Sequence, residues 1–446
     1  MASVPLSAIV LYALPYMSYA VVALPLALFV PSFYADELGL PLATVGYAIA
    51  ASRVLDILLD PLIGTLSDHT RTRFGRRKPW IVAGTPFFLL AAWRLLVPDE
   101  GVSSTYLLGW TALLFVSFTL VDLPFKAWGA ELSTDYAERS RITAWREAFG
   151  FAGQLVFVAV LLLLELCGRD TAHVQLHAVA WTLALTLPPL LALALWVVPE
   201  PRPEELRGRR PLGWGSLLVV IKNPALQRLL IAVVLFVAAV VVQATLHRLV
   251  LTHVILSPEV FTTLLLVENV VTIAAVPLWM RIAHRVGKHR ALSAAALWAG
   301  LWSLALPLFY AGQGWGLCAV LVVRGSSFAS ILFLANSIAA DVVDYDTVAS
   351  GHQRTGLLFA LWAVTYKLAI ALGILLATVI PASFGFEPSA PSHDELAKFA
   401  LMGVYGWLPG IMMGLGALAL WHFPIDEARQ RALRALIAER VVRSTT

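Results

Sequence analysis

The sequence predicts an all-α membrane protein with twelve transmembrane helices in two pseudo-symmetric six-helix bundles. Of its 446 residues, 59% are hydrophobic and only 13% are charged, and the mean hydropathy is +0.79. Soluble globular proteins carry about 25% charged residues. The chain also contains twelve successive apolar runs, and about 20 apolar residues suffice for a helix to cross a hydrocarbon core of roughly 30 Å. These observations favour a polytopic membrane protein.

The predicted spans follow one another along the whole chain. They cover residues 7–34, 42–66, 79–98, 105–131, 145–167, 173–197, 226–251, 257–280, 290–311, 315–340, 355–382 and 396–422. The first run is too long for a signal-peptide core and has no Ala-x-Ala cleavage site, so we expect a retained helix. Cys167 and Cys318 lie far apart in the sequence and predict neither a disulfide framework nor a metal site.

A polar stretch divides the spans into six and six. The segment "PEPRPEELRGRRPLGWGS" (199–216) is the longest polar interruption on its side of the membrane. We therefore expect four parts, namely an N-terminal bundle at 1–198, a cytoplasmic linker at 199–225, a C-terminal bundle at 226–423 and a cytoplasmic tail at 424–446. The tail, from Ile425 to Arg443, is predicted to be a basic amphipathic helix, either solvated or on the membrane surface.

The basic residues predict the orientation. Most of the 32 Lys and Arg residues fall in alternate loops and in the tail. By the positive-inside rule both termini are cytoplasmic, which suits a bacterial inner membrane if the source is bacterial. The net charge of +4 therefore reflects topology, and no nucleic-acid partner is expected. We expect a monomer that contacts the bilayer, a small-molecule substrate and a monovalent cation, with no cofactor.

Charged residues interrupt the second span, in "RVLDILLDPLIG" (53–64). A charge at the bilayer centre costs about 2.5–3.5 kcal/mol on insertion scales, and such residues normally face a bundle interior or an aqueous cavity. Arg53, Asp56 and Asp60 are separated by three and four residues, so they share one helical face.

The fourth span repeats this spacing with Thr119, Asp122 and Lys126. With Asp56 and Asp60, these residues offer an all-oxygen set, the ligand type that hard cations such as Na⁺ prefer. Clustered carboxylates in a low dielectric also favour a proton, so the residues leave Na⁺ and H⁺ both open. The alternative is that the charges only pair and hold helices together, as Asp122 and Lys126 would at i,i+4.

Three stretches resemble the melibiose-permease-like sugar:cation symporters, the glycoside–pentoside–hexuronide group of the major facilitator superfamily. They are "RVLDILLDPLIGTLSDHTRTRFGRRKPW" (53–80), "FTLVDLPFKAWGAELSTDYAERSRITAWR" (118–146) and "ADVVDYDTVASGHQRTGLLFALWAVTYK" (340–367). The resemblance implies the major facilitator fold and secondary active symport. It also implies a cation site of Asp56, Asp60 and Thr119, with Asp122 adjoining.

The same resemblance implies that Lys367 couples the cation site to the second bundle, with Arg53 beside the acids. The expected sugar contacts differ. Tyr19 and Ala20 replace the family's basic–acidic pair, Lys126 replaces a tryptophan, and Trp362 with Ala363 replaces polar residues. Arg146 matches the family's substrate-side arginine when one residue of slippage is allowed.

The predicted substrate site therefore consists of Tyr19, Asp122, Lys126, Arg146 and Trp362, and it is more basic and more apolar than a sugar site. These differences favour a glycoside, a uronide or a sugar acid. A lysolipid or another amphiphile is the alternative.

Loop charges predict gates for alternating access. Asp68 and Arg141 in the first half, with Asp341, Asp344 and Arg354 in the second, are expected to form ionic locks, and the alternative is solvated loop charge worth about 0–1 kcal/mol a pair.

A further intramembrane base is Arg324, which is followed by Gly325-Ser326-Ser327. It is predicted either to line the cavity or to pair with a backbone carbonyl or a lipid headgroup.

Two other classes of function were compared with transport. An enzyme is disfavoured because the sequence has no phosphate-binding Gly-rich loop, no His/Glu metal spacing and no nucleophile with a nearby base. A non-transporting sensor or assembly factor on the same fold would be expected to lose its cation-binding acids, and Asp56, Asp60 and Asp122 are present.

Overall fold

The computed structural model describes residues 4–99, 101–133, 135–169, 171–200, 223–350, 355–425, 429–430, 432–433 and 436. Most of the predicted linker, residues 201–222, lies outside this part. The chain separates into two compact units. The first comprises Met1–Arg209 with the short segment Glu387–Pro391, and the second comprises Arg210–Phe386 with Ser392–Thr446.

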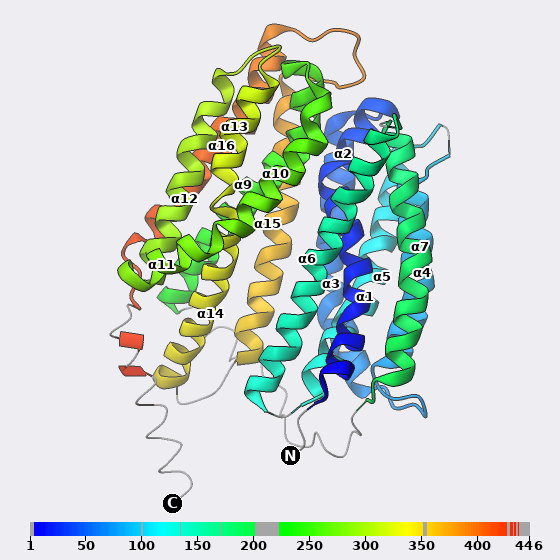
Figure 1. Cartoon of the computed structure of the whole chain (residues 1–446), viewed down its shortest axis with the longest axis vertical. Coiled ribbons are helices and arrows are strands. Elements are labelled where there is room, and N and C mark those ends of the chain that lie inside the picture. Colours follow the sequence, from blue (N-terminus) through cyan, green and yellow to red (C-terminus); the bar gives the residue numbers. More distant parts are fainter. Residues whose placement is uncertain are drawn as a thin grey trace, which may run out of the picture. The chain divides into compact units, whose positions relative to one another are not determined.

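The first unit is a bundle of long helices that run alongside one another (Figure 1). Helix α1 packs against α6 and α7, while α5 packs against α3 and α4. The elements are α1 (Leu6–Leu28), α2 (Val30–Ser32), the π-helix η1 (Phe33–Glu37), α3 (Leu42–His69), α4 (Lys78–Leu96), α5 (Ser104–Glu131), α6 (Tyr136–Leu166) and α7 (Ala172–Val197).

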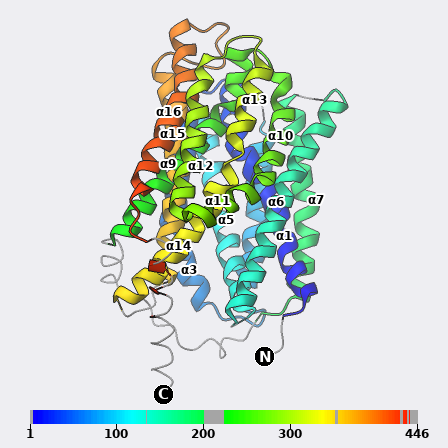
Figure 2. The same cartoon turned by 60° about the vertical axis from the view of Figure 1, so that its left-hand side comes forward.

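The second unit is also helical, and its long helices can be followed in both views (Figures 1 and 2). Helix α9 packs against α15 and α16, and α12 packs against α16 and α14. The elements are α9 (Pro224–Val250), η3 (Leu251–Ile255), η4 (Pro258–Val260), α10 (Phe261–Ala274), α11 (Val276–Val286), α12 (Lys288–Ala305), η5 (Leu306–Leu308), α13 (Gly314–Gly325), α14 (Phe328–Ser350), α15 (Thr355–Ser383) and α16 (Glu395–Trp421).

In the part of the chain that the structure describes, 12 helical stretches are long and apolar enough to cross a membrane. The prediction of twelve spans is therefore confirmed. The fifth span begins earlier than predicted, because α6 starts at Tyr136. Its start is fixed by the Asp135 carboxylate, which accepts a hydrogen bond of 2.9 Å from the Glu138 amide, as expected of an N-cap. Glu138 in turn accepts a hydrogen bond of 2.8 Å from the Val4 amide.

Small residues allow the helices of each unit to approach closely. A Cβ on Gly153 of α6 would lie 2.1 Å from the Met17 carbonyl oxygen of α1, and a Cβ on Gly84 of α4 would lie 2.8 Å from Val121 of α5. In membranes, where lipid tails are as apolar as the helices, such close backbone packing is a main source of helix association.

Two spans of the second unit are interrupted. The eighth passes from α10 to α11 at Ala275, and the tenth passes from α13 to α14 through Ser326 and Ser327. The residue after Ala275 begins α11, whose first turn contains a proline, and proline cannot donate the backbone hydrogen bond that would continue a helix.

The described part of the tail packs on the second unit, and its position at the membrane surface stays a prediction. Leu433 is buried and joins the hydrophobic core of that unit. The side-chain amide of Gln430 donates a hydrogen bond of 2.7 Å to Asp344, and the Arg429 guanidinium lies 5.4 Å from the ring centre of Tyr345. These contacts attach the tail to the C-terminal part of α14.

Candidate functional site

A buried carboxylate–hydroxyl pair joins α3 to α5. Asp56 is 0% exposed and Thr119 is 1% exposed, and the Thr119 hydroxyl donates a hydrogen bond to the Asp56 carboxylate. The Arg53 Nη1 atom lies 3.7 Å from Asp56 Oδ2. The Arg53 guanidinium also lies 3.8 Å from the ring centre of Phe115. The shared face of α3 therefore turns its acid toward α5, inside the first unit.

Asp60 lies one helical turn beyond Asp56 and is partly exposed. In the described residues, no group of three or more His, Cys, Asp or Glu side chains could hold a metal ion. Asp56, Asp60 and Asp122 therefore do not converge into one three-carboxylate cluster. The structure brings the oxygen atoms of Asp56 and Thr119 into direct contact.

A second charged pair lies further along α5. Lys126 Nζ is 2.7 Å from Asp122 Oδ2 at the i,i+4 spacing, so the pairing considered as the structural alternative is present. A narrow crevice beside Asp122 is lined by Tyr16, Tyr19 and Phe125, with two further residues of α5. The polar pair therefore borders an aromatic wall.

Tyr19 and Arg146 both contribute to this corner of the first unit. The Tyr19 ring is buried, and its centre lies 5.5 Å from that of Phe88 and 6.4 Å from that of Phe125. The Arg146 guanidinium of α6 lies 5.3 Å from the ring centre of Tyr16 and forms an ion pair of 2.6 Å with Glu147. Four of the five predicted substrate residues thus lie on helices α1, α5 and α6, which pack together. They are Tyr19, Asp122, Lys126 and Arg146.

Trp362 and Lys367 lie on α15 in the second unit, and both are partly buried. Trp362 packs against the hydrophobic core of that unit. The link from Lys367 to the cation site stays a prediction.

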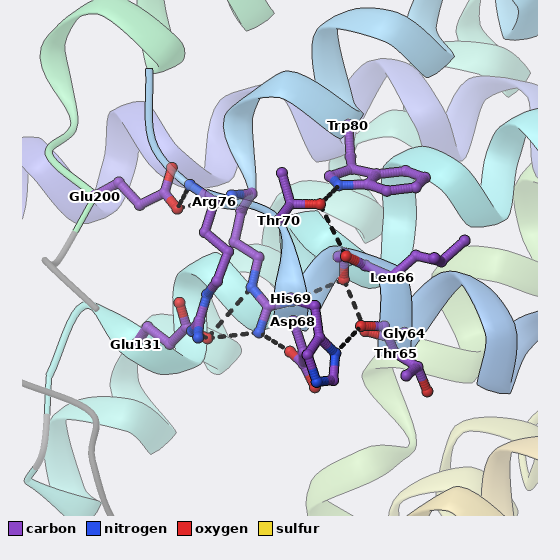
Figure 3. A network of polar contacts seen from close by, with 12 residues as sticks. Gly64, Thr65, Leu66, Asp68, His69, Thr70, Arg76, Trp80, Glu131 and Glu200 are labelled. Atoms are coloured by element: carbon purple, nitrogen blue, oxygen red, sulfur yellow. Dashed lines mark hydrogen bonds and ion pairs between the residues drawn. The ribbon is translucent and has the colours of Figure 1, made fainter. Parts of the chain in front are cut away.

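A network of charged groups surrounds the turn between α3 and α4 (Figure 3). The Arg77 guanidinium donates hydrogen bonds to Glu131 at 2.8 Å and to the Ser67 hydroxyl at 2.7 Å, and it also pairs with Asp68. Burial alone would lower the pKa of Arg77, but hydrogen bonds and charge from Glu131 and Asp68 raise it overall. This guanidinium is therefore held charged at the end of α5.

Glu200 closes the same turn from the end of α7. Its carboxylate accepts hydrogen bonds from the backbone amides of Arg76 and Arg77 at 2.5 and 2.7 Å (Figure 3). Gly75 has a φ of +107°, and a Cβ there would lie 2.1 Å from Glu200 Oε2. A glycine is required at this position both by the backbone conformation and by the carboxylate that lies against it.

The predicted gate residues have partners within their own units. Asp68 pairs with Arg77 in the first, and in the second Asp341 pairs with Lys288 at 2.7 Å, while Asp344 accepts the bond from the tail. Arg141 is exposed on α6. Arg354 lies outside the described residues. Ionic locks between the two halves stay a prediction.

Three acids of interest were missed from the sequence. Glu131 and Glu200 stand at the ends of the fourth and sixth spans, where an acid next to a basic loop is the available signal. Glu268 stands inside the predicted span 257–280, where an isolated acid is itself a signal. It pairs with Arg324 at 2.9 Å, so the expectation that Arg324 pairs with a backbone carbonyl or a lipid headgroup is wrong.

Residues 11–427 match the family described as MFS/sugar transport protein. The chain belongs to this family. Its members and structural neighbours are transporters, so this chain is a multi-pass membrane transporter of the major facilitator type and not an enzyme. The melibiose-permease-like resemblance and the predicted fold class are both confirmed.

Similar proteins cover nearly all of the chain. A glucuronide carrier protein homolog of Escherichia coli is 25% identical, over 90% of this chain and 89% of its own. The human sodium-dependent lysophosphatidylcholine symporter 1 is also 25% identical, over 86% of this chain and 77% of its own. The crystal structure of the nucleoside transporter NupG superposes with a TM-score of 0.67 at 12% identity, over 94% and 100% of the two chains, which establishes the fold alone.

Proposed function

We propose that this transporter carries a sugar, glycoside or sugar-acid-like solute by symport with a monovalent cation, Na⁺ or H⁺, through alternating access. The observation that carries the proposal is the buried Asp56–Thr119 pair between α3 and α5. A charged carboxylate in a membrane interior is costly unless it has a partner or a function. A cation that binds there in only one state of the cycle would link its own gradient to solute movement.

The geometry around Asp56 suits a weakly bound cation. The Arg53–Asp56 separation of 3.7 Å exceeds the roughly 2.7–2.9 Å of a tight charge-assisted hydrogen bond. Arg53 therefore neutralises Asp56 only in part, and a bound cation would supply further positive charge to this carboxylate. Asp60 on the next turn would supply a further oxygen.

The solute contacts favour an anionic or amphiphilic molecule. Lys126 and Arg146 bring positive charge to the corner where Asp122 meets Tyr16 and Tyr19. We assign solute binding to these residues together with Trp362. We also expect a monomer with both termini in the cytoplasm, and gating by the charged loops.

A lysolipid is the second candidate solute. The aromatic side chains beside Asp122 offer few hydrogen bonds to hydroxyl groups and favour contact with an apolar group. A relative that is named as a lysophosphatidylcholine symporter supports keeping this candidate. A non-transporting role is less well supported, since Asp56 and Thr119 still form the buried oxygen pair on which a cation site would depend.

The test is uptake into proteoliposomes that contain the purified full-length protein. Methyl glycosides of glucuronic acid and of glucose, with lysophosphatidylcholine as the third solute, would be supplied under an imposed Na⁺ or pH gradient. Accumulation of one solute under one gradient supports the proposal, and Asp56→Asn should abolish it. Asp99→Asn, which changes an exposed acid paired with Arg94, is the matched control. If neither gradient drives accumulation of any solute, the symport proposal is wrong.

A further inference from the structure

Arg324 lies at the point where the tenth span is interrupted, and it is only 3% exposed. Its Nη2 atom donates one hydrogen bond of 2.9 Å to Glu268 Oε1. Its guanidinium also lies 4.7 Å from the ring centre of Phe328. The Nε and Nη1 atoms are buried and have no hydrogen-bond partner among the described residues. The guanidinium thus donates one hydrogen bond to the Glu268 carboxylate, and two of its buried nitrogen atoms donate none.

This arrangement is incomplete for a buried ion pair. Guanidinium and carboxylate groups fit one another through two parallel hydrogen bonds, and buried charged donors without partners are costly. A second carboxylate, or one that replaces Glu268, could accept hydrogen bonds from the unpaired Nε and Nη1 atoms of Arg324. The resident Glu268 side chain shows which chemical group the site accommodates.

The backbone around Arg324 is held by donors from three other helices. The Thr272 hydroxyl bonds the Gly325 carbonyl at 2.8 Å, the Trp279 indole bonds the Ser326 carbonyl at 3.0 Å, and the Trp298 indole bonds the Val323 carbonyl at 2.9 Å. Carbonyl groups released by a helix break inside a membrane need such partners. The interruption is therefore a built element of the second unit.

Gly325 in the interruption allows the Glu268 side chain to lie close to the backbone of α13. A Cβ on Gly325 would lie 2.6 Å from Glu268 Cγ, so any larger residue would push the acid away. Helix α13 ends at Gly325 and α14 begins at Phe328, so opposite ends of two helix dipoles meet beside Arg324. Solute sites in transporters commonly lie at such discontinuous helices.

The other polar groups near Arg324 come from α9, α13 and α16. His247 of α9 shares a hydrogen bond of 2.6 Å with the Tyr405 hydroxyl of α16, and its buried Nε2 atom has no hydrogen-bond partner among the described residues. Cys318 lies on the same helix as Arg324. Glu268 of α10 is the acid that the guanidinium contacts, so a solute carboxylate would compete with it.

We propose that Arg324 binds the carboxylate of a transported sugar acid, and that Glu268 holds the guanidinium while the solute is absent. This inference rests on the proposed function and adds the solute class to it. It predicts an exchange of partners in which the solute carboxylate takes two donors of Arg324 and Glu268 is released.

The test is binding to the purified full-length protein by isothermal titration in sodium buffer and at two pH values. The probes are the methyl glycosides of glucuronic and galacturonic acid, each matched with the glycoside of the neutral parent sugar. The wild type should bind the acids at least tenfold more tightly than the neutral sugars. Arg324→Gln should lose most of this preference, and Glu268→Gln should tighten acid binding severalfold without changing neutral-sugar binding.

Two further variants separate the role of Arg324 from folding. Arg324→Gln with Glu268→Gln keeps a neutral hydrogen-bonded pair and should fold, as thermal unfolding will show, but with most of the preference for acids lost. Arg281→Gln removes a charge from an exposed position on α11 and should keep the full preference. Equal binding of acids and neutral sugars by the wild type, or a preference in the double variant as large as that of the wild type, overturns the role of Arg324. Binding of no probe under any condition contradicts the proposed sugar-like solute itself.

Discussion

The Thr119 hydroxyl of α5 donates a hydrogen bond to the Asp56 carboxylate of α3, and both side chains are almost completely buried. Replacing Thr119 with Ala should weaken apparent cation affinity by about tenfold or more, because a hydrogen bond to a charged group is worth about 1.5–3 kcal/mol. Cation titration of solute uptake in proteoliposomes measures this. Thr119→Ser keeps the hydroxyl and should stay near the wild type. Equal affinity in the Ala and Ser variants would show that the hydroxyl serves only packing.

Lys126 should determine solute charge preference more than stability. Its ion pair with Asp122 is local and only partly buried, so Lys126→Gln should lower the free energy of unfolding by no more than about 1 kcal/mol. Uptake of an anionic glycoside should fall relative to its neutral counterpart, since a positive charge is removed from the solute corner. Paired uptake assays with thermal unfolding check both halves. An unchanged uptake ratio would restrict Lys126 to holding Asp122 in place.

Glu131 and Asp68 should differ in what they contribute through Arg77. The Glu131 side chain is 13% exposed and that of Asp68 is 58% exposed. Glu131→Gln leaves a buried guanidinium short of charge and should cost about 3–5 kcal/mol, whereas Asp68→Asn should cost about 1 kcal/mol or less. Denaturation of the detergent-solubilised protein ranks the two variants. The opposite order would contradict the assignment of Glu131 as the main partner of Arg77.

Gly75 should tolerate alanine poorly because Glu200 lies against it. Gly75→Ala meets both a positive φ and a carboxylate oxygen at 2.1 Å, so it should destabilise the protein by about 2 kcal/mol or more. Gly101 has a φ of +75° and open space around its Cβ position, so Gly101→Ala isolates the cost of the backbone conformation. Adding Glu200→Ala to Gly75→Ala should restore part of the loss. Equal melting temperatures for the Gly75 and Gly101 variants would count against the carboxylate contact.

Local spacing allowed some of the site to be predicted, and tertiary contacts account for the rest. The Arg53–Asp56 and Asp122–Lys126 pairs follow from i,i+3 and i,i+4 geometry, which sequence reveals directly. The hydrogen bond between Thr119 and Asp56 joins residues 63 positions apart and depends on how their two helices are aligned. Sequence suggested that both residues face one cavity, but it did not specify their direct contact.

The same distinction applies to the fold. Apolar runs predicted twelve spans because length and composition are local properties. The start of α6 was missed because charged residues in its first turns resemble a loop, and the Asp135 cap that allows them to be helical is a matter of geometry. The break between α13 and α14 depends on Thr272, Trp279 and Trp298, which come from three other helices.

The Glu200 carboxylate links the chain just after α7 to the turn between α3 and α4 through two hydrogen bonds. These hydrogen bonds connect the end of the sixth span to the loop between the second and third spans before the chain enters the linker. A backbone nick between residues 201 and 222 would cut no element that the structure describes. The protein should accordingly tolerate production as two separate polypeptides that reassemble in the same membrane. One would end after Glu200 and keep these hydrogen bonds, and the other would start before Asn223.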